Sequence, residues 1–410
     1  MSKTHLLHII KPIFAPLSAI TLLMLGQGFF LTFISVYFNF LGHDQWLIGV
    51  VHSAFYAGML IGAYFAEKLI NRVGHIRAYA AFGAIGTACV LLQGLTSDPT
   101  VWTIARFITG FSMAVYYIVI ESWFLDKGTI ETRGVILSLY MIALYSSQAV
   151  GQYILNFVNI NSAEPFYVAG ILGALSAVPL TLTTSATPEL SIQSVQTLGK
   201  LLKVSPFGVI GCVIAGIILS SIYSFSPIYA LDVQIQVSFL VSVIIAGGVF
   251  LQWPLGRLSD IYDRRLVLLG VASFTLIPSI LILFFPYNQS VVFPLAFILG
   301  GLSFTLYPLS ITQVCDRLQP HDITKATSVL LIAYGTGAVF GPLIAPFFIE
   351  LMLPAGLFLF IGVTSILLSV VGLVSFIYIP KVPESIQTDF VALPNVSPVV
   401  YELDPRSDGE

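Results

Sequence analysis

The sequence predicts an all-α membrane protein with twelve transmembrane helices in two six-helix pseudo-repeats. Three observations lead to this fold class. The 410-residue chain is 57% hydrophobic and 9% charged, which is more apolar surface than one soluble core buries. Its apolar residues fall in runs long enough to cross a hydrocarbon layer of ~30 Å. Lys and Arg gather in alternate loops, as in proteins that obey the positive-inside rule.

Twelve apolar runs are long enough to be membrane spans. In chain order they are 17–40, 46–66, 77–96, 101–124, 134–158, 165–184, 206–230, 237–257, 266–286, 291–314, 325–350 and 354–379. The loops after the odd-numbered runs contain no Lys or Arg, and all but one of the 17 basic residues lie in the other loops, their edges and the two tails. This asymmetry supports the count of twelve and places both termini in the cytoplasm.

A polar stretch at 185–205 divides the runs into six and six and is expected to be a cytoplasmic linker. We therefore expect an N-terminal six-helix bundle at 1–184 and a C-terminal six-helix bundle at 206–379. Residues 380–410 are rich in Pro and acidic residues and have little apolar periodicity, so we expect a disordered cytoplasmic tail.

Weak similarity between the halves supports a duplicated fold. A shift of 190 positions places Gly110 on Gly300 and Gly151 on Gly341, together with a few other matches. Such residual similarity is typical of membrane folds built from internal repeats.

Two charged turns occupy corresponding places in the two halves. The second reads Gly256-Arg257-Leu258-Ser259-Asp260-Ile261-Tyr262-Asp263-Arg264-Arg265, and the first reads Asn71-Arg72-Val73-Gly74-His75-Ile76-Arg77. In the second turn Gly256 allows two helices to approach closely, and Asp260 can cap a helix or pair with a cation. Arg264 and Arg265 are inexpensive only in water or headgroups, so the turn lies at a membrane surface. Positive-inside anchoring alone would explain the arginines but not the Gly/Asp spacing.

The second turn resembles the G-x-L-x-D-R-x-G-R-R signature of the major facilitator superfamily, with Asp263 in place of a glycine. The first turn resembles it less, because Asn71 replaces the aspartate. Longer segments, among them Arg72–Ala78, Glu121–Trp123 and Gln252–Asp260, resemble the bacterial YcaD-like subgroup. The resemblance implies a multi-pass transporter of the bacterial plasma (inner) membrane, with two bundles that rock about a central cavity.

What the resemblance implies for the turns is a cytoplasmic gate. Their residues would stabilise the state that is closed to the cytoplasm. The gate and motif residues are Asn71, Arg72, Gly74, Arg77, Gly256, Asp260, Arg264 and Arg265, with Glu121 and Arg133 beside them.

Arg106 is the one basic residue well inside a predicted span. An intramembrane arginine is costly unless it faces a cavity or a partner, so it is a candidate functional residue. Arg106-x-x-x-Gly110 also resembles the fourth-helix motif of the superfamily, whose arginine is often implicated in proton coupling. Tyr117 follows at helical spacing on the same face. The alternative is that Arg106 snorkels to the outer surface as an anchor.

Acidic and titratable residues are scarce in the spans. No Asp or Glu lies in mid-span, and Glu121 is ~22 Å along the helix from Arg106, too far to pair with it. We expect Glu121 to join a cytoplasmic charge cluster with Arg133, Arg72 or Arg77. His52 can titrate near neutral pH, although a lone helical histidine is more often a packing residue.

Neutral polar side chains are the remaining candidates for a solute site. They offer hydrogen bonds and ring faces within the spans, although each also suits contact between helices. They are Gln27, Tyr145, Gln148, Gln152, Gln252, Tyr307 and Tyr334.

We therefore predict a secondary active transporter of an unnamed small solute that works by alternating access in the lipid bilayer. Protons are a candidate coupling ion, and the missing mid-span acid favours the alternative of a proton-independent facilitator. A transporter-like sensor without turnover is the alternative from another class. No enzyme motif, metal-ligand spacing or nucleic-acid signal is present, so we expect no catalysis, cofactor, metal or nucleic acid, and a monomer.

Overall fold

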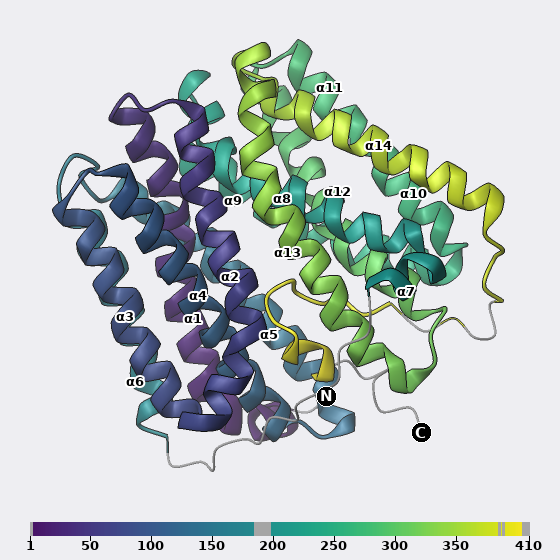
Figure 1. Ribbon diagram of the computed structural model, residues 1–410, viewed down its shortest axis with the longest axis horizontal. Helices are drawn as coiled ribbons and strands as arrows, with labels where there is room; N and C mark the ends of the chain where they lie inside the picture. The colour runs from purple at the N-terminus through teal and green to yellow at the C-terminus, as the bar shows by residue number, and fades with distance from the viewer. Residues whose placement is uncertain (1–2, 184–197, 384–386, 388–389, 404–410) are drawn as a thin grey trace. The chain divides into compact units, whose positions relative to one another are not determined.

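The computed structural model describes residues 3–183, 198–383, 387 and 390–403, and these residues form helices and no strand (Figure 1). The helices are α1 (Lys3–Phe40), α2 (Gln45–Val73), α3 (His75–Leu95), α4 (Pro99–Lys127), α5 (Ile130–Gly151), η1 (Gln152–Asn156), α6 (Glu164–Thr181), α7 (Leu198–Val204), α8 (Pro206–Asp232), α9 (Val237–Ile261), α10 (Arg264–Phe274), α11 (Leu276–Phe284), α12 (Gln289–Cys315), α13 (Pro320–Leu351), α14 (Gly356–Tyr378) and η3 (Val399–Leu403).

The described helices include twelve segments long and apolar enough to cross a membrane. Two of these spans are composite: α5 continues into η1, and α10 with α11 forms the ninth span. The predicted all-α fold with twelve spans is confirmed. Most of the predicted linker at 185–205 lies outside the described residues.

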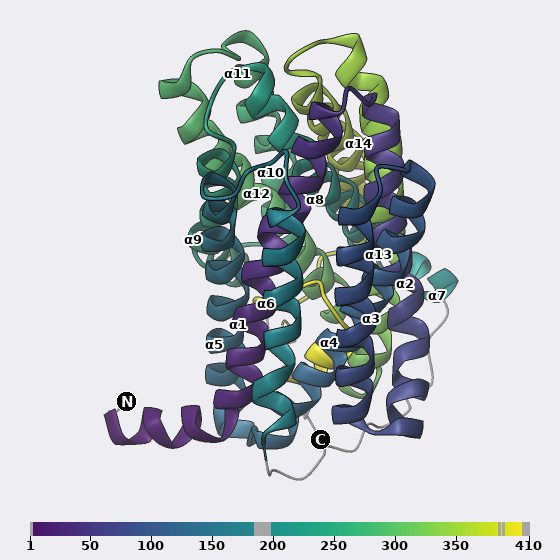
Figure 2. The same cartoon turned by 90° about the vertical axis from the view of Figure 1, so that its left-hand side faces the viewer.

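The first helix begins earlier than the predicted span at residue 17. Figure 2 shows that its N-terminal turns run at a steep angle to the rest of α1. Pro12 and Pro16 lie in that part of the helix and remove backbone donors, which accounts for the bend.

The chain forms two compact units, and each is described by itself. Unit 1 comprises residues 1–30, 54–194 and 396–410, and unit 2 comprises residues 31–53 and 195–395. The inclusion of residues 31–53 in unit 2 differs from the expected boundary at 184. Within unit 2 the hydroxyl of Ser35 donates to the Ser224 carbonyl at 2.7 Å, an example of the packing of this segment against α8.

Reciprocal glycines bring α2 and α4 together in unit 1. A Cβ on Gly58 would lie 1.9 Å from the Phe107 carbonyl oxygen, and a Cβ on Gly110 would lie 2.0 Å from the Phe55 carbonyl oxygen. Contacts this short exclude any side chain, so the two backbones approach as closely as small residues allow. Helices α1 and α5 meet in the same way at Gly28 and Gly151.

Unit 2 repeats this arrangement. A Cβ on Gly247 of α9 would lie 1.9 Å from the Phe297 carbonyl oxygen, and a Cβ on Gly300 of α12 would lie 2.0 Å from the Ile244 carbonyl oxygen. Gly300 is the residue that the 190-position shift aligns with Gly110. The weak sequence repeat therefore corresponds to an equivalent helix contact in each half.

The described part of the tail differs from the expected disorder. Residues Val399–Leu403 form η3, and Val396, Val400 and Tyr401 are buried. The expectation rested on low apolar periodicity, but a short segment needs only a few apolar residues when it packs on existing helices. Residues 384–386, 388–389 and 404–410 of the predicted tail lie outside the described residues.

Candidate solute site and charged turns

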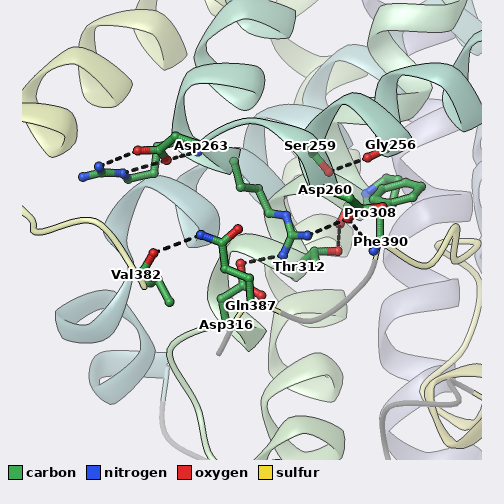
Figure 3. Close-up of polar contacts among 12 residues, drawn as sticks. Gly256, Ser259, Asp260, Asp263, Pro308, Thr312, Asp316, Val382, Gln387 and Phe390 are labelled. Carbon is green, nitrogen blue, oxygen red and sulfur yellow. Dashed lines mark hydrogen bonds and ion pairs between the residues drawn. The ribbon is translucent and has the colours of Figure 1, made fainter. Parts of the chain in front are cut away.

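A buried ion-pair network forms around Arg264 in unit 2 (Figure 3). Its Nη1 donates to Asp316 Oδ2 at 2.5 Å, and its Nη2 donates to Asp260 Oδ1 at 2.9 Å. The Arg264 and Asp316 side chains are 2% and 4% exposed, whereas Asp260 is 29% exposed. The network ties the turn between α9 and α10 to the end of α12.

Replacing Asp316 by alanine is expected to destabilise the protein by ~3 kcal/mol or more, because it leaves a buried guanidinium short of its most buried partner. Asp260→Ala provides a matched control at the more exposed partner, for which the expected loss is about 1 kcal/mol. Thermal unfolding in one detergent measures both. Equal losses from the two variants would contradict the assignment of Asp316 as the main counter-charge.

Asp263, the departure from the superfamily signature, has a local role. Its carboxylate caps α10 by accepting from the Arg265 backbone amide at 3.0 Å, and it pairs with Arg265 Nη2 at 2.7 Å. Burial raises the pKa of Asp263, but the side-chain and backbone hydrogen bonds from Arg265 outweigh burial, so the pKa lies below its ordinary value. The pair therefore contributes stability at neutral pH that is lost as pH falls through the lowered pKa.

Gly256 contacts the tail rather than a second helix. A Cβ at this position would lie 2.1 Å from Cδ1 of the Phe390 ring. The backbone amide of Phe390 also donates to Asp260 Oδ1 at 2.8 Å. The expectation that Gly256 admits a neighbouring helix is wrong for these described contacts, because an aromatic ring occupies the space in front of it.

Arg106 is completely buried in unit 1, on the second turn of α4. Its guanidinium carbon lies 4.1 Å from the centre of the Phe55 ring and 6.0 Å from that of Phe30. Within the described residues none of its three side-chain nitrogens has a hydrogen-bond acceptor. This burial is incompatible with a side chain that snorkels to the membrane surface.

Arg106 lines a cavity of about 50 Å³ within unit 1. The cavity lies among α1, α3, α4 and α6, and its polar lining residues are Gln27, Thr87, Arg106, Thr109, Ser112 and Tyr116. Apolar side chains such as Leu23, Phe30 and Met113 complete the wall. This mostly apolar space with a few polar groups is small, so it can hold only a small molecule or part of a larger one.

Comparison with known proteins identifies the family. The sequence matches the profile of the Major Facilitator Superfamily over residues 17–236 and 233–398. The chain belongs to this superfamily. The uncharacterized MFS-type transporter YcaD of Salmonella dublin is 30% identical over 340 residues, which cover 81% of this chain and 87% of that protein. The same-named protein of Salmonella enteritidis PT4 is also 30% identical, with the same coverage.

Solved major facilitators share the fold. The nucleoside transporter NupG superposes with a TM-score of 0.71 at 17% identity, covering 90% of this chain and 99% of that chain. A bacterial homologue of the human lysosomal transporter Spinster, in an inward-facing and occupied conformation, superposes with a TM-score of 0.71 at 15% identity, covering 95% and 98%. Together with the family match, these superpositions establish a membrane transporter of the major facilitator fold.

The first charged turn of this facilitator lacks the buried network of the second. Asn71, Arg72 and Arg77 are exposed, and no ion pair joins them within the described part of unit 1. Gly74 has a φ of 89°, a left-handed conformation that favours glycine and explains that residue in the turn. The asparagine at position 71 removes the acid that a buried arginine would need.

Glu121 does not form the expected charge cluster. It is completely buried, its Oε1 accepts from the Tyr140 hydroxyl at 2.6 Å, and its Oε2 accepts from the hydroxyl of Ser397 in the tail. No ion pair to Arg133, Arg72 or Arg77 is present in the described residues of unit 1. The prediction of that cluster is wrong because the tail covers the carboxylate with neutral donors.

The other predicted polar residues differ in whether they line the Arg106 cavity. Gln27 lines the Arg106 cavity, whereas Gln152 links helices by donating to the Gly28 carbonyl at 2.8 Å. The remaining residues lie outside this cavity. The Tyr117 hydroxyl donates to Met24 Sδ, and the ring centres of Tyr307 and Tyr334 lie 4.8 Å apart. Tyr145 and Gln252 are buried, and the backbone of Gln148 packs against Gly28.

His52 has a packing role in unit 2. Its Nε2 lies 2.8 Å from the Ser35 hydroxyl oxygen, and that hydroxyl donates its hydrogen bond to the Ser224 carbonyl. The imidazole must therefore donate from Nε2, which fixes its tautomer. A histidine held in this way serves the contact between α1, α2 and α8.

Sequence reasoning missed several contributors. Phe30 and Phe55 contact Arg106, but a phenylalanine in an apolar run carries no local signal. Thr87 was detectable as a hydroxyl within the third span, and Asp316 as an acid at the end of the tenth. Nothing in the sequence indicated that Ser397 would meet Glu121, because 276 residues separate them.

Proposed function

We propose that this major facilitator is a secondary transporter that moves a small solute by alternating access. Arg106 carries the proposal. A buried charge without a partner costs several kcal/mol, and membrane proteins retain such groups mainly along solute and ion pathways. The guanidinium lines a cavity, so a solute can supply the missing acceptor.

We propose that transport does not require protons. The described residues that line the cavity include no Asp, Glu or His, so the cavity itself offers no conventional proton acceptor. Glu121 is held by the hydroxyls of Tyr140 and Ser397 and does not line the cavity. A facilitator driven by the solute gradient is therefore the form of transport that this site supports best.

The test begins with a thermal-unfolding screen of the purified protein against amino acids, sugars, nucleosides, organic acids, metal chelates and cationic drugs at pH 6 and pH 8. A ligand that binds the folded state raises the unfolding temperature. Each stabilising compound is then assayed by counterflow in phosphatidylcholine vesicles, with and without a pH gradient. We expect saturable counterflow that is unchanged by the gradient. Binding without counterflow would favour the sensor alternative, and acceleration by the gradient would show proton coupling.

We further propose that the protein lies in the bacterial inner membrane as a monomer with both termini in the cytoplasm. The distribution of Lys and Arg supports this orientation. Reporters fused after Asp98 and Asn288, which cap α4 and α12, are expected to read out on the periplasmic side. A cytoplasmic readout from either fusion would refute the orientation. The mass of the protein–detergent complex tests the monomer.

The charged turns are proposed to stabilise the state closed to the cytoplasm. The buried Arg264 network supports this role, because it holds the turn in a fixed position against the end of α12. Thiol labelling of cysteines introduced at the cytoplasmic ends of the spans tests it: Asp316→Asn is expected to increase labelling. Unchanged labelling would make the network purely structural.

A further inference from the structure

The Arg106 cavity lacks the negative charge that its guanidinium needs. The contact with the Phe55 ring offsets part of the cost of burying the cation. Burying an ion costs more than one aromatic contact returns, so this contact alone does not compensate for the burial of Arg106. Tyr56 interacts electrostatically with Arg106, but a phenol is neutral at pH 7. No acid pairs with Arg106 among the described residues of unit 1.

The polar side chains that line this cavity and have no partner within the described residues can all donate hydrogen bonds. Besides Arg106, the Gln27 amide nitrogen and the Thr87 hydroxyl have no partner within the described residues. The other hydroxyls are committed to backbone carbonyls: Thr109 donates to Arg106, Ser112 to Ile108 and Tyr116 to Phe82. A ligand in this space therefore meets a cation, an amide donor and a hydroxyl that can donate or accept, a set that favours an anion.

Size and charge restrict the anion. A cavity of about 50 Å³ is well below the ~300–1,000 Å³ of typical drug-sized ligand pockets, so the anion must be small. Arg106 is the only Lys, Arg or His among the described residues that line it, so the site balances one negative charge. A guanidinium presents a planar fork that matches a carboxylate in two parallel hydrogen bonds.

We propose that the cavity binds the carboxylate group of a small monocarboxylate, through Arg106 with Gln27 and Thr87 as supporting donors. This inference rests on the proposed function, because it names the substrate class of the same site. It assigns Gln27 from α1 and Thr87 from α3 to recognition of the same group as Arg106 on α4, so the three helices converge on one anion.

Matched ligands test the charge without any mutation. Propionate and its neutral amide, propionamide, differ little in size, and inorganic phosphate provides a second anion. Binding is measured by thermal unfolding and by calorimetry of the protein in phosphatidylcholine nanodiscs, which exclude anionic headgroups as the source of an anion. We expect saturable stabilisation by propionate and none by propionamide. Equal binding of the amide, preference for phosphate or no binding of any monocarboxylate from formate to hexanoate would overturn the proposal.

Variants then test the residues. Arg106→Gln is expected to weaken propionate binding at least tenfold, and Gln27→Ala and Thr87→Val by about threefold to tenfold each. Gln93→Ala is the control for loss of a buried amide on α3, because Gln93 does not line the cavity. If Arg106→Gln does not fold, the two supporting variants decide: unchanged affinity in both would refute the assignment of these donors.

The two proposals fail in different ways. Saturable propionate binding without counterflow would leave the anion site intact and refute transport of this solute class. Counterflow of a neutral solute that propionate does not inhibit would leave the transporter intact and refute the carboxylate. Radiolabelled propionate counterflow, measured beside calorimetry on the same preparation, separates these outcomes.

Discussion

Replacing Gly110 by alanine is expected to destabilise the protein strongly and to disrupt the Arg106 cavity. The new Cβ would lie 2.0 Å from the Phe55 carbonyl oxygen, well inside van der Waals contact, so α2 and α4 must separate. Overpacking of this kind typically costs about 1–3 kcal/mol. The new Cβ would meet a backbone atom, which cannot move aside as a flexible side chain can. Phe55 supplies the ring that stacks on Arg106, so the same displacement weakens that contact.

The measurement is the yield and unfolding temperature of monodisperse protein, followed by ligand binding. Gly134→Ala is the matched control, because a Cβ at that helical position meets nothing within 4 Å. It is expected to be neutral or stabilising by up to ~1 kcal/mol. Gly300→Ala, at the equivalent contact of unit 2, is expected to resemble Gly110→Ala in stability. If Gly110→Ala and Gly134→Ala behaved alike, the close approach of α2 and α4 would be refuted.

Removing residues 390–410 is expected to cost the folded state ~2–4 kcal/mol. The tail buries Val400 and Tyr401 in unit 1, and apolar side chains of this size contribute about 1.5–3 kcal/mol each before the cost of ordering the segment. The deletion also removes the Ser397 hydroxyl from the completely buried Glu121.

Point variants measure the contribution of single buried side chains without deleting the tail. Val400→Ala removes fully buried methyl groups and is expected to cost about 1–2 kcal/mol, whereas Val391→Ala, at a partly exposed position of the same tail, is expected to cost less than half as much. Thermal unfolding measures both. An unchanged unfolding temperature in the deletion and in Val400→Ala would show that the tail adds no stability.

The membrane-spanning organisation was predictable because its physical causes are local. The length of an apolar run determines whether it crosses the bilayer, and the loop charges follow from the cost of moving Lys and Arg across it. The ninth span shows what local patterns do not predict. Its apolar run was identified from the sequence, but the break between α10 and α11 was not. The break lies at Thr275, whose hydroxyl donates to the Val271 carbonyl.

The candidate site was predictable only in part. Arg106 carried a strong signal, because one charge inside an apolar run is expensive wherever the helix packs. Glu121 lies near the predicted cytoplasmic end of the same apolar run, and its expected arginine partners were wrong. The identity of a partner depends on which distant segment arrives, and Ser397 lies 276 residues away.

The sequence by itself determined the family, the twelve spans and the residues whose burial needs a reason. Charge, hydropathy and the positions of glycines can be read from the sequence, and the bilayer requires apolar segments to form helices that satisfy their own backbone hydrogen bonds. Only the tertiary structure decided what surrounds those residues: the rings that hold Arg106, the donors that share its cavity, and the tail that covers Glu121 and Gly256. These contacts join segments far apart in the chain, and their selection depends on how whole helices pack.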